Sequence, residues 1–117
     1  MAEPLPPQIV HGYGDGLFRI AGAEHRGSVI VFANRTVPWT GEISEIGLAE
    51  VFAAADALDL LLVGCGAVLR PVPPELRAAL RRARIAVEPM DTGAACRTFN
   101  VLLAEERRVA AALVAMG

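Results

Sequence analysis

The residues best suited to chemistry in this chain gather in one short stretch, Met90–Leu103. Asp91 and Thr92 offer side-chain oxygens that can cap the start of a helix. The small residues that follow, Gly93–Ala95, leave the backbone N–H groups of the first helical turn almost bare. Bare N–H groups at a helix start attract negative charge. The stretch therefore predicts a helix start that is polar within an otherwise apolar helix.

Arg97, Thr98 and Asn100 add a guanidinium, a hydroxyl and an amide to the first two turns. Such a group predicts either an anion site or a buried polar lock. In the first hypothesis, Arg97 and the first-turn N–H groups bind a carboxylate or a phosphate. In the second, a buried Arg97 is paired with Asp91 or Glu88, or with nearby carbonyls, because a buried charge needs a partner.

A second motif, Gly64-Cys65-Gly66, follows an apolar run and resembles half of a nucleotide-binding turn. Neither the dinucleotide pattern nor the P-loop pattern is completed, and prolines stand where a phosphate-binding helix would begin. The motif favours glycines that permit tight packing. It remains the second part of the candidate ligand site.

The two cysteines, Cys65 and Cys96, match no C-x-x-C spacing and are expected to be free thiols. Cys96 lies near a helix start, where a thiol pKa can be lowered. Its histidine partners would be His11 or His25, both in the N-terminal third. A Cys–His nucleophile and a redox pair of cysteines are both unsupported, and no carboxylate pair or metal cluster stands out. We predict no catalytic residue, no metal and no cofactor.

Composition narrows the class of protein. A chain of 117 residues fits one domain, and a hydrophobic content of 54% excludes general disorder. No apolar run approaches the roughly 20 residues that span a bilayer. The net charge of −2 gives no overall attraction to nucleic acid. The first residues lack the features of a secretory signal, so a cytoplasmic protein is predicted.

All eleven basic residues are arginines, and several of them surround one predicted helix. These are Arg70, Arg77, Arg81, Arg82 and Arg84. Two interpretations are open: a solvated helix face, or a docking surface for an acidic protein.

The elements that position these groups begin with a disordered leader over residues 1–7, followed by a single α/β domain over residues 8–117. Short strands separated by turns then predict an antiparallel meander. The strands are Gln8–Gly12, Leu17–Ala21 and Ser28–Ala33, with turns at residues 13–16 and 22–27. Val37–Trp39 is predicted as an edge strand, because Pro38 cannot donate to a central ladder.

The rest of the chain alternates helix and strand. An apolar stripe with helical spacing runs from Leu48 to Leu58, with Ser44 as its predicted N-cap. Two short parallel strands, Asp59–Gly64 and Ile85–Glu88, flank a helix that opens at the proline pair 73–74. The helix at Thr92 follows, and Arg107–Met116 is predicted to be helical as well. The fold class is therefore α/β: a β-meander joined to a βαβα part with three to four helices.

The parallel arrangement brings Gly64–Gly66 next to Pro89–Thr92 at the carboxyl edge of the sheet. Ligands usually bind at this edge in open α/β sheets. The candidate ligand site therefore combines both motifs. Its residues are Gly64, Cys65, Gly66, Asp91, Thr92, Gly93, Arg97, Thr98 and Asn100.

Several phrases along residues 8–116 together resemble one family. They are Gly12-Tyr13-Gly14, Gly27-Ser28, Trp39, Leu61-Leu62-Val63-Gly64-Cys65-Gly66, Pro74-Glu75-Leu76-Arg77, Val87-Glu88-Pro89-Met90-Asp91-Thr92, Ala95-Cys96-Arg97-Thr98-Phe99-Asn100-Val101-Leu102 and Arg107-Arg108-Val109-Ala110-Ala111-Ala112-Leu113. The family is the domain of unknown function shared by archaeal and bacterial proteins, a mitochondrial respiratory complex I assembly factor and an adipogenesis-associated protein.

The resemblance implies a compact α/β fold, no established enzymatic activity and no agreed catalytic residues. The chain departs from the family pattern at two positions. Cys65 replaces an expected threonine, which argues against chemistry that needs a hydroxyl there. Glu106 replaces a glycine before the Arg-Arg pair, which suggests a straighter C-terminal helix.

We therefore expect a non-enzymatic interaction domain that assists assembly of a redox or membrane complex. It would act with an unidentified protein partner, as a monomer or small homo-oligomer, without nucleic acid or a membrane span. The alternative is a small-anion or small-molecule binding protein, or an undiscovered enzyme, with its site at the helix start near Asp91–Arg97.

Overall fold

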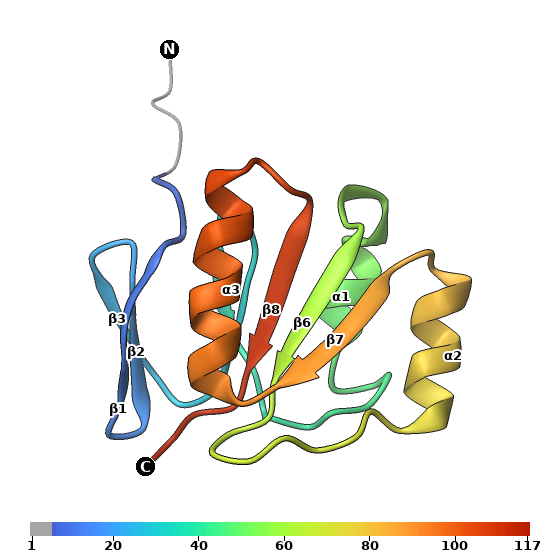
Figure 1. Cartoon of the computed structure of the whole chain (residues 1–117), viewed down its shortest axis with the longest axis horizontal. Helices are drawn as coiled ribbons and strands as arrows, with labels where there is room; N and C mark the ends of the chain where they lie inside the picture. The colour runs from blue at the N-terminus through green and yellow to red at the C-terminus, as the bar shows by residue number, and fades with distance from the viewer. Residues whose placement is uncertain (1–5) are drawn as a thin grey trace.

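The computed structural model describes residues 6–117 of the chain (Figure 1). The predicted leader falls mostly on residues 1–5, which lie outside the described residues. Pro6 and Pro7 precede the first strand, and their carbonyls accept hydrogen bonds from the Gln8 side chain and the Ile9 backbone.

The first three strands form a small antiparallel sheet in the order β1-β2-β3. They are β1 (Val10–Gly14), β2 (Leu17–Ile20) and β3 (Ala23–Arg26). Asp15 and Gly16 have φ values of 54° and 75°, as a tight hairpin requires. The turn predicted over residues 22–27 is wrong, because it contains β3. Its polar residues suit an exposed edge strand, and Ala21 and Gly22 alone supply the left-handed turn.

A separate five-stranded sheet has the order β5-β4-β8-β6-β7. Its strands are β4 (Val29–Val31), β5 (Thr36–Pro38), β6 (Leu60–Gly64), β7 (Ala86–Met90) and β8 (Val109–Leu113). Strand β6 is parallel to both β7 and β8, whereas β4 is antiparallel to β5 and β8. The predicted meander is thus divided between two sheets. The edge position predicted for Pro38 and the parallel pairing of β6 and β7 are confirmed.

The helix predicted over Arg107–Met116 is wrong, because this segment contains β8. Its alanines favour a helix in isolation, but helix propensity is a weak term that tertiary context overrides. Every residue of β8 is buried between β4 and β6, which form the ladder on its two sides. Glu106 therefore lies in a turn rather than in a straighter helix, with a φ of 59°.

Among residues 6–117, three helices cover the larger sheet: α1 (Ala49–Ala53), α2 (Pro74–Arg82) and α3 (Thr92–Ala104), with a 3₁₀ turn at Ala55–Ala57. Residues of α1 and α2 share one core cluster with one face of the sheet. Residues of α3 and β2 share a second cluster with the other face. The small sheet therefore lies against α3, on the opposite side from α2 (Figure 1).

Helix starts agree only in part with prediction. Pro74 occupies the first turn of α2, as expected. Ser44 does not cap α1, because that helix begins only after Leu48. The Ser44 hydroxyl instead accepts the Gly47 N–H at 3.0 Å and closes a turn that precedes the helix. Within residues 6–117, no helix is both long enough and apolar enough to cross a bilayer.

Candidate functional site

The two predicted motifs meet at the carboxyl edge of the larger sheet. The Cys65 N–H donates to the Met90 carbonyl at 2.8 Å, and the Thr92 N–H donates to the Gly66 carbonyl at 2.8 Å. Parallel pairing of β6 and β7 produces this contact, because it ends both strands at the same edge. The predicted juxtaposition is confirmed.

Thr92 is the centre of a buried hydrogen-bond network at this edge. Its side chain is fully buried, and its hydroxyl donates to the Val114 carbonyl at 2.8 Å and accepts the Gly66 N–H at 2.9 Å. The Val114 N–H donates to the Gly64 carbonyl at 2.9 Å. One hydroxyl therefore ties the exits of β6 and β8 to the start of α3. This arrangement is the polar lock of the second hypothesis, with Thr92 rather than Arg97 at its centre.

Asp91 is the N-cap of α3, as predicted. One oxygen of its carboxylate accepts the Ala94 N–H at 2.9 Å, and its carbonyl accepts the Ala95 N–H at 3.0 Å. The Thr92 N–H is also satisfied within the chain. A carboxylate of the protein thus already occupies the place where an external anion would bind, so the anion-site alternative is not supported.

Two glycines allow close approach around the helix start. A Cβ on Gly64 would lie 3.0 Å from the Thr92 Cα and 3.0 Å from a methyl of Leu113. A Cβ on Gly93 would lie 2.6 Å from the Tyr13 hydroxyl. Gly64 therefore brings β6 against α3, and Gly93 leaves room for Tyr13. Both observations agree with glycines that permit packing rather than ligand binding.

Arg97 is exposed, and its guanidinium donates to the Tyr13 hydroxyl at 3.3 Å. It forms no ion pair with Asp91 or Glu88 among the described residues. The hypothesis of a buried, paired Arg97 is therefore wrong. Arg97 points outward because α3 buries a different face, which contains Ala95, Cys96 and Phe99.

Asn100 joins α3 to the small sheet. Its side-chain oxygen accepts the Val10 N–H, and its amide donates to the Val10 carbonyl, both at 2.9 Å. The amide therefore pairs with the backbone of β1 as a neighbouring strand would. Thr98 is half-buried, and no hydrogen bond of its side chain is recorded among residues 6–117. These two candidates do not converge with Gly64–Gly66 on one site.

Both cysteines are buried and free. Burial raises the pKa of the Cys96 thiol from 9.0 to about 12, and the smaller effects of Arg97 and Asp91 oppose each other. The lowered pKa considered for Cys96 is thus wrong, because desolvation outweighs the helix start. The Cys65 sulfur lies 3.6 Å from the carbonyls of Val63 and Arg70. Within the described residues, no group of three His, Cys, Asp or Glu side chains could hold a metal ion.

An exposed apolar loop follows the lock. Val68 is 72% exposed and Leu69 is 58% exposed. They lie between the glycine motif and α2, at the carboxyl edge. Sequence reasoning missed this feature, although two aliphatic residues next to Arg70 and Pro71 are a weak signal for it.

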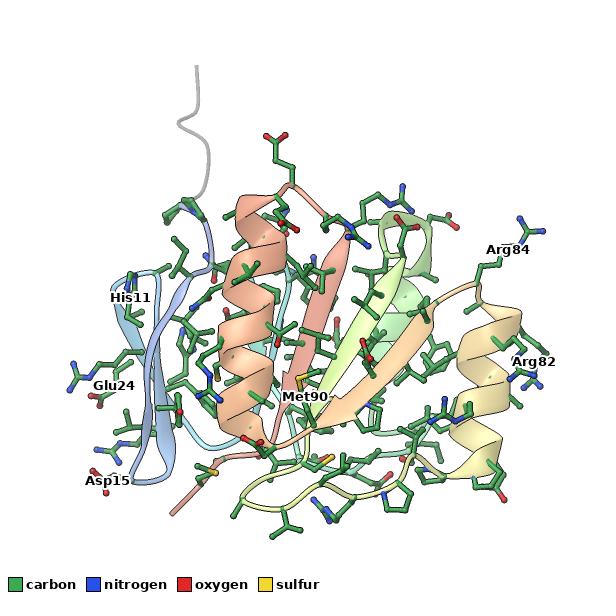
Figure 2. All side chains as sticks on the ribbon, viewed as in Figure 1. His11, Asp15, Glu24, Arg82, Arg84 and Met90 are labelled. Atoms are coloured by element: carbon green, nitrogen blue, oxygen red, sulfur yellow. The ribbon has the colours of Figure 1, made fainter. Side chains whose placement is uncertain are left out.

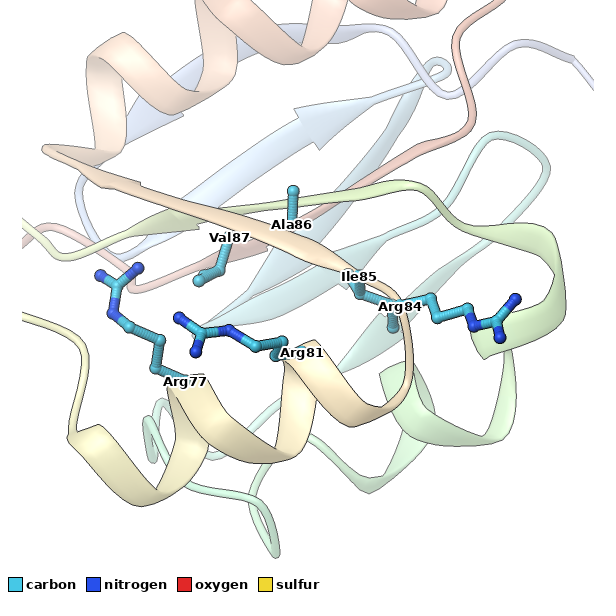
Figure 3. A pocket seen from close by; sticks show the side chains of 6 residues that line it. All are labelled: Arg77, Arg81, Arg84, Ile85, Ala86 and Val87. Atoms are coloured by element: carbon cyan, nitrogen blue, oxygen red, sulfur yellow. The ribbon is translucent and has the colours of Figure 1, made fainter.

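The predicted arginine surface contains a groove between α2 and the edge strand β7 (Figure 3). The groove has a volume of about 390 Å³. Three arginines and the start of β7 line it: Arg77, Arg81, Arg84, Ile85, Ala86 and Val87. Arg82 and Arg84 project from the α2 end of the molecule (Figure 2). The sequence indicated the arginines but not the groove.

Comparison with known proteins places this arrangement in context. An uncharacterized protein of Rhodobacter capsulatus is 47% identical over 107 residues, which cover 92% of this chain and 84% of that protein. The NADH dehydrogenase [ubiquinone] 1 alpha subcomplex assembly factor 3 of Danio rerio is 31% identical over 110 residues, which cover 91% of this chain. The alignment spans 63% of that assembly factor's own length.

Among solved structures, an outer membrane protein from Bartonella henselae matches with a TM-score of 0.88 and 39% identity. The match covers 99% of this chain and 100% of that one. The sequence pattern of one protein family, described as a protein of unknown function (DUF498/DUF598), matches residues 10–114 of this chain. The chain therefore belongs to the DUF498/DUF598 family.

Proposed function

We propose that this protein is a non-enzymatic interaction domain that assists the assembly of a redox or membrane complex. The assembly factor from Danio rerio supports this role, because it aligns with 91% of the chain at 31% identity. A cytoplasmic location and a monomeric or small homo-oligomeric state are part of the same proposal.

One observation carries the proposal. The carboxyl edge, where open α/β sheets usually bind small ligands, is filled by the protein's own hydrogen bonds around Thr92. Beside it, Val68 and Leu69 are exposed aliphatic side chains on a loop. The polar groups at this edge already have partners within the chain, and the side chains next to them are apolar and exposed. This combination favours contact with a protein over catalysis, because burying Val68 and Leu69 against a partner removes apolar surface from water.

Gentle purification of the tagged full chain from its native host tests the proposal. We expect it to retain a subunit of a redox or membrane complex, identified by mass spectrometry. Deleting the gene should lower the amount of the fully assembled complex on native gels. Elution alone, at the mass of a monomer or homo-oligomer, together with normal complex levels in the deletion strain, would contradict an assembly role.

A matched pair of variants locates the contact. Val68→Ser combined with Leu69→Ser should lower the recovery of the partner severalfold. Val101→Ser removes another exposed aliphatic side chain, 58% exposed on α3, and should leave recovery unchanged. Equal losses in both variants would exclude the loop as the contact surface.

A further inference from the structure

One region of this acidic chain carries a net positive charge. Residues 60–87 contain five arginines and a single acid, Glu75. The remainder of the chain contains six arginines and twelve acids. A net charge of −2 therefore conceals a local basic surface on an otherwise acidic protein.

Arg77 and Arg81 lie on the side of α2 that borders the groove, and Arg84 lines the groove from the turn after the helix, with its side chain pointing away from theirs (Figure 3). Arg77 and Arg81 are four residues apart, so their side chains are neighbours on the helix, where like charges destabilise it. Among residues 6–117, no ion pair to Arg77, Arg81 or Arg84 is recorded. The repulsion is thus uncompensated within the described chain.

Arg84 occupies a strained backbone position. The Ile85 N–H donates to the Leu80 carbonyl at 2.9 Å, and the Arg84 N–H donates to the Arg81 carbonyl at 3.0 Å. This is the bonding pattern that usually places glycine at the position of Arg84. Arg84 adopts a φ of 62° there, although a side chain is disfavoured in this region. Arginine therefore occupies a position at which glycine would have less backbone strain.

The floor of the groove is the start of β7, which is the last strand of its sheet. Its outer side has no neighbouring strand within the described residues, so an extended segment can pair there. Pro89, which cannot donate, limits such pairing to the first part of the strand, around Val87. In Figure 3, the Val87 side chain points toward Arg77 and Arg81, and Ala86 points to the opposite face.

We propose that the groove between α2 and β7 binds an extended acidic segment of the partner protein, a proposal that rests on the assembly role above. The carboxylates of that segment pair with Arg77, Arg81 and Arg84. Its backbone runs beside β7 near Val87. Attraction between these carboxylates and the arginines is the physical reason for affinity, and the loss of repulsion along α2 adds a smaller contribution.

A protein segment fits the groove better than a nucleic acid does. The lining residues Ile85, Ala86 and Val87 include no aromatic ring on which a base could stack. The twelve acids elsewhere on the chain repel an extended polyanion. A short acidic segment needs only the local arginines.

Fluorescence anisotropy with a labelled peptide of alternating Glu and Thr tests the proposal directly. The full chain should bind this peptide, and affinity should fall steeply as salt is raised. A peptide of the same length with Gln in place of every Glu should not bind. Equal binding of both peptides would overturn the proposal.

Two triple variants identify the surface. Arg77→Gln, Arg81→Gln and Arg84→Gln together should lower affinity by at least about tenfold. Arg19→Gln, Arg26→Gln and Arg107→Gln remove the same charge elsewhere and should change affinity less than about threefold. An equal loss in both triples would reveal unspecific attraction and overturn the assignment to the groove.

A single substitution separates binding from folding. Arg84→Gly relieves the left-handed backbone, so its urea midpoint should hold or rise while its affinity for the acidic peptide falls. Glu106→Gly makes the same backbone change on α3 and should leave peptide affinity unchanged or slightly higher. Full affinity in Arg84→Gly would remove Arg84 from the binding surface and contradict its proposed role.

Competition defines the class of ligand. Inorganic phosphate, single-stranded RNA and vesicles of phosphatidylserine and phosphatidylcholine should compete poorly with the peptide at equal charge concentration. Displacement by RNA or by vesicles at lower concentration than by unlabelled peptide would overturn the proposal. The assembly role is tested separately: peptide binding without a native partner contradicts that role alone, and a native partner retained by the groove triple contradicts the groove alone.

Discussion

At the scale of single residues, Thr92 shows how one hydroxyl can hold three elements together. It connects the exits of β6 and β8 to α3 and is completely buried. A buried N–H or carbonyl that loses its partner costs about 1–3 kcal/mol. The hydroxyl therefore matters more to stability than its size suggests.

Thr92→Val keeps the shape of the side chain but removes the bonds to the Gly66 N–H and the Val114 carbonyl. We expect the free energy of unfolding to fall by about 2–4 kcal/mol, measured by urea denaturation. Thr92→Ser retains the hydroxyl and should lose less than half of that amount. Equal losses for the two variants would show that the methyl group stabilises the fold as much as the hydroxyl does, which would contradict a dominant role of the lock.

Cys96 makes stability depend on pH in the alkaline range. Its thiol has a pKa of about 12 in the folded protein and 9.0 as the ordinary value, because burial disfavours the thiolate. Above pH 9 the unfolded chain therefore binds fewer protons than the folded one, and stability falls as pH rises toward 12.

Urea denaturation of the wild type at increasing pH measures this effect. The added slope should approach about 1.4 kcal/mol per pH unit well above pH 9, and it should be absent below pH 8. Cys96→Ala lacks the thiol and should lose this extra slope. Parallel curves for the two proteins between pH 9 and 11 would mean that the thiol ionises in the folded state.

At the scale of elements, α2 and α3 end in the same way. The Glu106 N–H donates to the Leu103 carbonyl, and the Arg107 N–H donates to the Leu102 carbonyl, both at 3.0 Å. This repeats the pattern at the end of α2. Both helices therefore place a long charged residue at a left-handed position, which makes each helix end a site of local strain.

Glu106→Gly should relieve that strain at the end of α3. We expect the free energy of unfolding to rise by about 0.5–1 kcal/mol, measured by urea denaturation. Glu105→Gly is the matched control, because Glu105 has a φ of −86° and gains nothing from glycine. A lower stability for Glu106→Gly would show that the Glu106 side chain makes a stabilising contact that outweighs the backbone strain.

Asn100 acts between elements rather than within one. Its side-chain amide makes two hydrogen bonds with the backbone of Val10, as a neighbouring strand would, and so joins the small sheet to α3. Phe18 and Ile20 of β2 add apolar contacts in the same cluster as Phe99. The small sheet is therefore held by side-chain hydrogen bonds from Asn100 and Arg97 and by an apolar cluster, not by continuation of the larger sheet.

At the scale of the whole molecule, β8 is the centre of the fold. Ala110 and Ala112 face the cluster shared with α1 and α2, and Ala111 faces the cluster shared with α3. Alanines here let helices approach both faces of a central strand. The three small residues thus allow close packing on both faces of β8.

Ala111→Leu tests that role. Overpacking between β8 and α3 should lower the free energy of unfolding by about 1–3 kcal/mol, measured by urea denaturation. Ala104→Leu, on the exposed end of α3, should change stability by less than about 0.5 kcal/mol. An unchanged stability for Ala111→Leu would contradict close packing of α3 on β8.

Sequence alone was sufficient where the signal is local. The apolar run that forms β6, the prolines that open α2 and the Asp91 cap of α3 depend on neighbouring residues, and the structure confirms each of them. The meeting of the two motifs at the carboxyl edge also followed from sequence, because parallel strands joined by one helix leave few topologies. Family membership followed from the order of the motifs.

Tertiary structure decided the features that depend on partners distant along the chain. Val109–Leu113 has the local preferences of a helix and becomes a strand only because β4 and β6 offer ladders on both sides. Thr92 became the centre of the lock because the fold brings Gly66 and Val114 to it, although they lie 26 and 22 residues away along the chain. Arg97 became an exposed residue because Phe99 and Cys96 set which face of α3 is buried. Local sequence determines helix and strand propensity and helix capping. Burial and long-range hydrogen bonds depend instead on which elements pack together in the folded chain.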